Sequence, residues 1–259
     1  MSATVLDQIL ARTRADVELR KRDLPSAQLQ QRGPLKSKKI FRDALTGTDI
    51  AVIAEFKRRS PSAGPLRAGA AVGEIAAAYE RGGAAAMSVL TDGPHFDGSL
   101  EDLRAARAAC ALPLLRKDFI LDPYQLHEAR AAGADAVLLI VAALAPDTLA
   151  ELHELVRELG MDALVEVHDR SELDVALALG ADLIGINNRD LRDFSVDVQR
   201  TFGLLAHIPA GAVVVSESGI ASPVQLRELH AQGVHAVLVG ESLMRAPDPA
   251  LALRALTNF

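Results

Sequence analysis

The chain has 259 residues, of which 49% are hydrophobic but only 3% aromatic, and it contains no tryptophan. This length is close to that of an eightfold β/α barrel, and the composition supports one large core built from Ala, Val, Leu and Ile. The formal net charge of −6, with no basic face evident in the sequence, argues against nucleic acid as a partner.

Cysteine usage and hydropathy indicate the cellular setting. The single cysteine, Cys110, cannot form an internal disulfide, which is typical of a reducing compartment. No apolar run approaches the roughly 18 residues of a membrane span. Residues 1–22 are polar and charged and lack the apolar block of a signal peptide. We therefore expect a cytoplasmic protein without a membrane segment.

The first part of the chain precedes any repeating pattern. Residues 4–22 carry apolar side chains at near-helical spacing, which predicts an amphipathic helix that ends before Pro25. Residues 26–39 are polar and are interpreted as a connector, and residues 41–45 as a short second helix. Residues 1–48 are thus expected to form a helical extension, which could be a lid over a site or a packing appendage.

From residue 49 onward, apolar runs alternate with helical segments. The apolar runs predict eight strands, at residues 50–56, 85–90, 114–117, 136–141, 163–167, 183–186, 212–215 and 236–239. The segments that follow them predict eight helices, at residues 72–81, 100–109, 123–132, 146–159, 171–179, 198–206, 223–231 and 249–256.

This alternation predicts the fold class. The strands are continuously apolar, as parallel strands buried on both faces are. Eight such units favour an α/β fold of the closed (β/α)8 or TIM-barrel type, in one domain of residues 1–259 whose barrel covers residues 49–259. An open doubly wound sheet is the alternative that the pattern leaves open.

Polar residues stand where the predicted strands end. In a barrel of this kind these ends converge on one opening. Lys117 ends a strand led by two leucines, and an isolated buried ammonium costs several kcal/mol unless a carboxylate or a substrate group neutralises it. Any one such residue could belong to a core ion pair, but packing does not require so many of them. The strand-end residues are Glu55, Lys57, Ser88, Lys117, Glu166, Asn187, Arg189, Glu217, Ser218 and Gly240.

Two glycine-containing segments follow the last two strands. They are residues 216–220, SESGI, and residues 239–243, VGESL. Small residues let backbone N–H groups approach an anion, and the loops after strands seven and eight commonly hold phosphate in such barrels. We therefore expect a phosphate site there, although ordinary turn glycines would look the same.

Apolar residues near the same opening could enclose a flat ring or could simply be core. The histidines show no metal-ligand spacing, so no metal site is indicated. Cys110 ends a helix and is interpreted as an inert apolar residue. The candidate ring-enclosing residues are Phe96, Phe119, Leu138, Ile140, Leu191 and Phe194.

Several sequence blocks, in this order and spacing, resemble indole-3-glycerol phosphate synthase, the ring-closing enzyme of tryptophan biosynthesis. They include KDF at 117–119, VEVH at 165–168, NNRDL at 187–191 and ESGI at 217–220. The resemblance implies a monomeric barrel without a cofactor. It also implies conversion of 1-(2-carboxyphenylamino)-1-deoxyribulose 5-phosphate to indole-3-glycerol phosphate, CO2 and water.

The resemblance further implies residue roles. Lys117 would be the general acid on the substrate ketone, and Glu166 the acid/base of dehydration. Lys57 would bind substrate and assist proton transfer, while Glu55 and Asn187 would orient hydroxyls and lysines. Ser60 and Arg189 would lie near the substrate carboxylate, Ser88 in the substrate pocket, and the six apolar residues around the anthranilate ring. The phosphate would be held by Ser218, Gly219, Gly240 and Glu241.

Two rival functions remain. Phosphoribosylanthranilate isomerase has a similar barrel but uses a cysteine at a strand end as its base, and no predicted strand here ends in cysteine. A non-catalytic barrel that binds phosphosugars would keep the glycine loops but has no need of Lys117 and Glu166.

Overall fold

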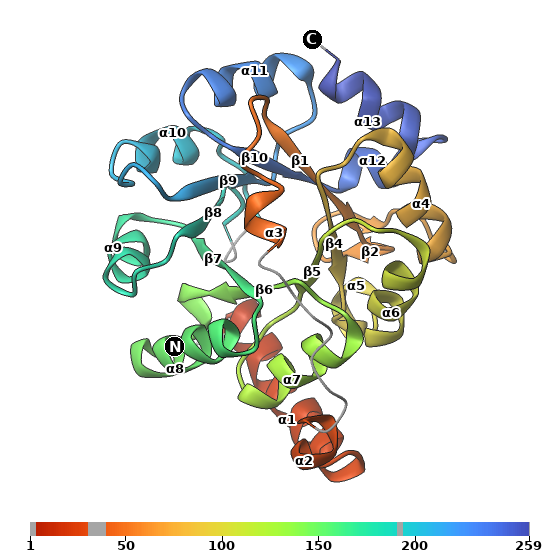
Figure 1. Ribbon diagram of the computed structural model, residues 1–259, viewed down its shortest axis with the longest axis vertical. Coiled ribbons are helices and arrows are strands. Elements are labelled where there is room, and N and C mark those ends of the chain that lie inside the picture. The colour runs from red at the N-terminus through yellow and green to blue at the C-terminus, as the bar shows by residue number, and fades with distance from the viewer. Residues whose placement is uncertain (1–3, 31–39, 191–193, 259) are drawn as a thin grey trace.

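The computed structural model describes residues 4–30, 40–190 and 194–258. Eight parallel strands close into a barrel in the order β1-β10-β9-β8-β7-β6-β5-β4, which confirms the predicted (β/α)8 barrel (Figure 1). The barrel strands are β1 (Ala51–Phe56), β4 (Ala86–Leu90), β5 (Leu114–Lys117), β6 (Ala136–Ile140), β7 (Asp162–Val167), β8 (Leu183–Asn187), β9 (Val213–Glu217) and β10 (Ala236–Val239). A two-stranded hairpin, β2 (Arg59–Ser60) with β3 (Gly64–Pro65), stands in the loop after β1.

A helix follows each barrel strand and packs on the outside of the barrel. These outer helices are α4 (Val72–Gly82), α6 (Leu100–Ala109), α7 (Pro123–Ala132), α8 (Pro146–Glu158), α9 (Arg170–Ala178), α10 (Gln199–Leu205), α11 (Pro223–Ala231) and α13 (Pro249–Thr257). Shorter helical turns lie in the loops, as α5 (Gly93–Phe96), η1 (Val141–Ala143) and α12 (Glu241–Arg245). Left-handed glycines such as Gly83 and Gly133 end α4 and α7.

Side chains along each strand alternate between two separate apolar clusters. The outward cluster joins the strands to the helices, for example through Val52, Met87 and Leu139. The inward cluster fills the barrel, and its members include Ile53, Ala86, Leu115, Leu138, Leu164, Leu183, Val213 and Leu238. Because both faces are buried, the strands are mostly apolar, and most of their polar residues lie near the carboxyl ends, whereas Asp162 stands at the start of β7.

Helix α3 (Ile40–Asp43) closes the amino-terminal end of the barrel, and Figure 1 shows it across the ring of strands. Phe41 and Leu45 are fully buried in the inward cluster. The backbone N–H of Arg42 donates to Asp162 Oδ2 at 3.0 Å, and its guanidinium donates to the carbonyl of Gly211 at 2.9 Å. The extension therefore plugs the barrel at the end opposite the predicted site.

Helix α1 (Val5–Asp23) lies against α7 and begins with a capping box between Thr4 and Asp7. Its Ile9 and Leu10 join the inward cluster, and Val17 packs against Tyr124 of α7. Residues 26–39, predicted as a connector, begin with the short helix α2 (Ser26–Gln30), which also contacts α7. None of the described helices is both long and apolar enough to cross a membrane.

Removing the plug should destabilise the barrel without altering its site. We expect Phe41→Ala to lower the free energy of unfolding by about 3–5 kcal/mol, because a fully buried ring is deleted. Urea unfolding followed by circular dichroism measures this change. A loss below about 1 kcal/mol would contradict the plugging role of α3.

Candidate active site

A cavity of about 490 Å³ opens at the carboxyl ends of the strands. This volume lies in the usual range of small-molecule sites, about 300–1,000 Å³. Three residues of α1, Val5, Leu6 and Ile9, also line it. Every barrel strand contributes to the lining, with Glu55, Leu90, Lys117, Leu138, Glu166, Asn187, Glu217 and Leu238 among the residues.

The fold brings most of the predicted site residues to this one cavity. Those that line it are Glu55, Lys57, Ser60, Phe96, Lys117, Phe119, Leu138, Ile140, Glu166, Asn187, Arg189, Phe194, Ser218, Gly219, Gly240 and Glu241.

Two predicted residues stand apart. Ser88 is fully buried and is not among the lining residues, because it pairs in register with Glu55 and Leu115 inside the barrel, two residues before Leu90. Its hydroxyl has no hydrogen-bond partner in the described part of the chain. Leu191 lies outside the described residues.

Lys117 lies in the cavity and forms ion pairs with two carboxylates. Its Nζ lies 2.6 Å from Glu217 Oε2 and 3.3 Å from Glu166 Oε2. Burial alone would lower the pKa of Lys117, but Glu217 and Glu166 outweigh that effect and raise the pKa above its ordinary value. The side chain is therefore an ammonium at neutral pH, aimed into the cavity.

Glu217 is the principal residue to which the sequence assigned no role, although it ends an apolar strand just as Glu166 stands near the end of β7. Burial raises the pKa of Glu217 to about 7, despite the adjacent Lys117. A Cβ at Gly185 on the neighbouring strand β8 would collide with the Glu217 carboxylate. Glycine at 185 therefore makes room for this carboxylate.

Glu166 has the opposite protonation tendency. Burial opposes its ionisation, but Lys117, His168 and a hydrogen bond from Asn187 together lower the pKa of Glu166. One ammonium thus lies between a carboxylate that is ionised and a second, Glu217, that titrates near neutrality. Groups with divergent pKa values in one cavity are suited to proton transfer in both directions.

A second ion pair lies on β1. Glu55 and Lys57 are two residues apart, share a face of the strand and form a salt bridge. A Cβ at Gly240 would collide with the Glu55 carboxylate, so the backbone of the β10–α12 turn approaches this side chain closely. Lys57 therefore presents a second cation to the cavity.

His168 lies behind Glu166, at the start of the loop after β7. Its Nε2 is 3.4 Å from Glu166 Oε1, and its Nδ1 is 3.0 Å from Glu172 Oε2 on α9. Burial would lower the pKa of His168, but the hydrogen bond with Glu172 and the charge of Glu166 raise it. The imidazole thus connects an active-site carboxylate to a second carboxylate outside the cavity.

The remaining lining divides into an apolar part and an anion-binding part. Phe119, Leu138 and Ile140 belong to the inward cluster and continue the apolar surface of α1. Across the cavity, Ser218 and Gly219 both adopt left-handed conformations, with φ of 66° and 79°. A Cβ at 219 would also collide with Val196, so glycine is required there.

Two residues expected near a carboxylate lie in loops over the cavity. The Ser60 hydroxyl, in β2, accepts a hydrogen bond from the backbone N–H of Ala63 at 3.1 Å. Arg189 donates to the carbonyl of Phe194 at 3.1 Å. Among residues 4–30, 40–190 and 194–258, no group of three His, Cys, Asp or Glu side chains is arranged to hold a metal.

Comparison with known families gives a specific match. Residues 6–256 match the family model described as indole-3-glycerol phosphate synthase. The indole-3-glycerol phosphate synthase of Aromatoleum aromaticum is 50% identical over 257 residues, covering 97% of this chain and 98% of that relative. The enzyme of the same name from Bordetella pertussis is 56% identical and covers 83% of this chain and 82% of its own length.

Solved structures share the fold at low identity. A 3-hexulose-6-phosphate synthase from Salmonella typhimurium gives a TM-score of 0.62 at 15% identity, covering 80% of this chain and 97% of that one. An N-acetylmannosamine-6-phosphate 2-epimerase from Clostridium perfringens gives 0.61 at 17% identity, covering 78% and 89%. At such identities these likenesses establish the barrel alone.

The raised pKa of Glu217 gives a pH-dependent stability. Between pH 4.5, the ordinary pKa of a glutamate, and about pH 7, the folded state binds this proton and the unfolded state does not, so the wild type loses stability as pH rises. We expect Glu217→Gln to become more stable relative to wild type across that window, by about 3 kcal/mol at most, and constant above it. Urea unfolding at several pH values measures this; a difference that does not vary with pH would contradict the raised pKa.

Glu172 should control the protonation of His168. We expect Glu172→Gln to lower the pKa of His168, because a hydrogen-bonded carboxylate is replaced by a neutral amide. Imidazole NMR titration measures the change, with His127 on α7 as an internal control. An unshifted His168 titration would show that Glu172 does not act on it.

Proposed function

The chain belongs to the indole-3-glycerol phosphate synthase family, and we propose that its cavity closes the indole ring by general acid–base catalysis. The family is a decarboxylating lyase of tryptophan biosynthesis that converts 1-(2-carboxyphenylamino)-1-deoxyribulose 5-phosphate to indole-3-glycerol phosphate, CO2 and water. The proposal concerns which side chains of this chain carry out each step.

The placement of Lys117 between two carboxylates is the observation that supports the proposal most strongly. Ring closure needs a proton on the ketone oxygen as the aromatic carbon attacks the carbonyl carbon. The Lys117 ammonium, whose side chain is 14% exposed, contacts the buried carboxylates of Glu217 and Glu166 and is thus a cationic acid held in a fixed position. Such an acid contributes about 10²–10⁴-fold in rate. The attacking ring carbon then loses its carboxylate as CO2, and the electron pair of the broken C–C bond returns to the ring.

Dehydration completes the product. We assign Glu166 to this stage: it removes the proton from the amine side and supplies one to the departing hydroxyl, which leaves as water. The lowered pKa of Glu166 favours the first of these transfers, and Lys117 and His168 adjoin the carboxylate as proton sources. Lys57, paired with Glu55, would bind substrate and assist proton transfer.

The substrate would span the cavity from its apolar side to its glycine loops. Phe119, Leu138 and Ile140, with α1 beside them, provide an apolar surface for the anthranilate ring. The left-handed Ser218–Gly219 turn and the Gly240–Glu241 turn at the start of α12 would hold the phosphate through backbone N–H groups. Ser60 and Arg189 would contact the substrate carboxylate.

The proposal extends to the setting of the enzyme. We infer a cytoplasmic monomer that acts on a phosphorylated small molecule without a cofactor, and whose helix α1 serves as a lid. Val5, Leu6 and Ile9 line the cavity, which supports the lid assignment. Analytical ultracentrifugation tests the monomer; a concentration-independent dimer would contradict it.

The rival isomerase finds no support in the site. Its base would be a cysteine at a strand end, whereas Cys110 caps α6 and is absent from the cavity lining. A non-catalytic barrel that binds phosphosugars would not need the Lys117 ammonium and its two carboxylates, Glu217 and Glu166. No observation favours either over ring closure.

Substitution of Lys117 tests the proposal. We expect Lys117→Ala to reduce turnover by about 10²–10⁴-fold, because the acid is lost, while affinity for indole-3-glycerol phosphate changes less than about tenfold. Since the chain lacks tryptophan, the indole fluorescence of the product is measured without tryptophan emission from the protein. Turnover near the wild-type rate in a folded variant would remove Lys117 from the acid role.

A further inference from the structure

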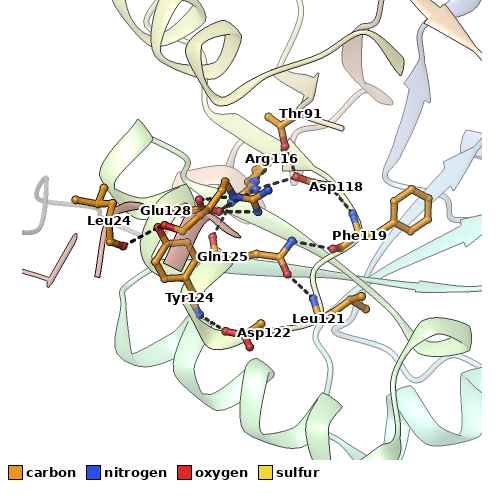
Figure 2. Close-up of polar contacts among 11 residues, drawn as sticks. Leu24, Thr91, Arg116, Asp118, Phe119, Leu121, Asp122, Tyr124, Gln125 and Glu128 are labelled. Carbon is orange, nitrogen blue, oxygen red and sulfur yellow. Dashed lines mark hydrogen bonds and ion pairs between the residues drawn. The ribbon is translucent and has the colours of Figure 1, made fainter. Parts of the chain in front are cut away.

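A buried polar network lies directly behind Lys117. Arg116, the preceding residue of β5, is only 1% exposed and makes contacts with four partners. Its guanidinium donates to Thr91 Oγ1 at 3.0 Å, to the carbonyl of Gln125 at 2.7 Å and to Asp118 Oδ2 at 2.8 Å. It also lies 3.4 Å from Glu128 Oε2 (Figure 2).

Such a network is not explained by stability alone. Replacing a buried ion pair with apolar side chains of similar volume is often neutral or stabilising. Arg116 and Asp118 flank Lys117 in sequence, and the Asp118 carboxylate also accepts hydrogen bonds from Thr91 and from the N–H of Phe119. The network therefore fixes the backbone on both sides of the proposed acid.

Helix α7 holds the loop that follows. Gln125 is fully buried, and its side-chain amide donates to the carbonyl of Phe119 at 2.8 Å and accepts from the N–H of Leu121 at 2.8 Å. Figure 2 shows this amide on α7 with its hydrogen bonds to the backbone of Phe119 and Leu121. Phe119 lines the cavity, so α7 sets the position of one wall of the site.

The same face of α7 also holds α1. Arg20 of α1 donates to both oxygens of Glu128, at 2.7 and 3.2 Å. The Tyr124 hydroxyl donates toward the carbonyls of Arg20 and Leu24, at 3.1 and 2.9 Å. Glu128 is 4% exposed, and its Oε2 is shared between Arg20 and Arg116.

Glu128 thus contacts both α1, through Arg20, and β5, through Arg116, the residue before the proposed acid Lys117. The first turns of α1 line the cavity, while Arg20 lies near the other end of the same continuous helix. A helix rises about 1.5 Å per residue and behaves as a stiff rod over this length, so fixing its Arg20 end orients its Val5 end.

We propose that Glu128 is a positioning residue that couples helix α1 to the end of strand β5. Through Arg20, Glu128 holds α1 over the substrate. Through Arg116, it fixes the positions of Lys117 and Phe119. A substitution that breaks one of these two contacts therefore also alters the geometry at the other. The kinetic consequence rests on the proposed function, whereas the structural coupling does not.

The kinetics of Arg20→Gln test whether Arg20 holds α1 over the cavity, and a variant on the same helix serves as a matched control. Arg12 is exposed and pairs only weakly with Asp16 within α1, at 3.8 Å, so Arg12→Gln removes the same charge without loosening the anchor. We expect Arg20→Gln to raise KM about three- to tenfold with little change in kcat, because the covered state is less populated. Equal KM values for the two variants would overturn the proposal.

The double variant tests the coupling. Glu128→Gln is expected to raise KM as Arg20→Gln does and also to lower kcat about tenfold, since Arg116 loses one of its carboxylates. In the Glu128→Gln background, Arg20→Gln should then add no further increase in KM. The proposal would be overturned if the effects of the two substitutions on KM multiplied in the double variant, or if folded Glu128→Gln kept the wild-type kcat.

A ligand-free measurement separates this inference from the proposed function. We expect the backbone amide NMR signals of residues 117–121 to shift in Arg20→Gln and to stay in place in Arg12→Gln. This arm needs neither substrate nor a foldable Glu128 variant. Unshifted signals in Arg20→Gln would overturn the coupling even in an active enzyme, and shifted signals would support it even if ring closure were absent.

Discussion

One buried ammonium between two carboxylates is the constraint on which the site depends. Lys117, Glu217 and Glu166 come from three strands, β5, β9 and β7, which the closed barrel brings together. Without Lys117 the carboxylates would lie unpaired in an apolar interior, and without them the ammonium would be costly. Gly185 and Gly240 carry no side chain where the Glu217 and Glu55 carboxylates lie, so the surrounding strands accommodate the charges.

The two ends of the barrel differ in role: the amino-terminal end contributes to stability, and the carboxyl end carries the candidate site. At the amino-terminal end, α3 inserts Phe41 and Leu45 into the interior and fastens itself to the strand starts. At the carboxyl end, the same extension supplies α1, whose first turns line the cavity. Residues that precede the barrel in sequence therefore contribute to both ends of it.

The sequence predicted the barrel and most of the residues that line the cavity because both leave local signals. Parallel strands are continuously apolar, so a charge near a strand end, as at Lys117 or Glu166, is conspicuous. The role of Glu217 was not predicted, since its pairing with Lys117 depends on distances between strands. Ser88 is not among the lining residues, because the strand register places Leu90, two residues later, at the cavity. The Arg20–Glu128 contact joins surface-type residues far apart in sequence, and no periodicity marks it.

The protonation state of Lys117 is the central claim, and NMR of lysine side-chain nitrogens tests it most directly. With the Lys117 signal assigned by Lys117→Arg, its Nζ is predicted to remain an ammonium at pH 10.5, the pH at which an ordinary lysine is half neutral. Deprotonation of Lys117 below that pH in the folded, ligand-free protein would contradict the account.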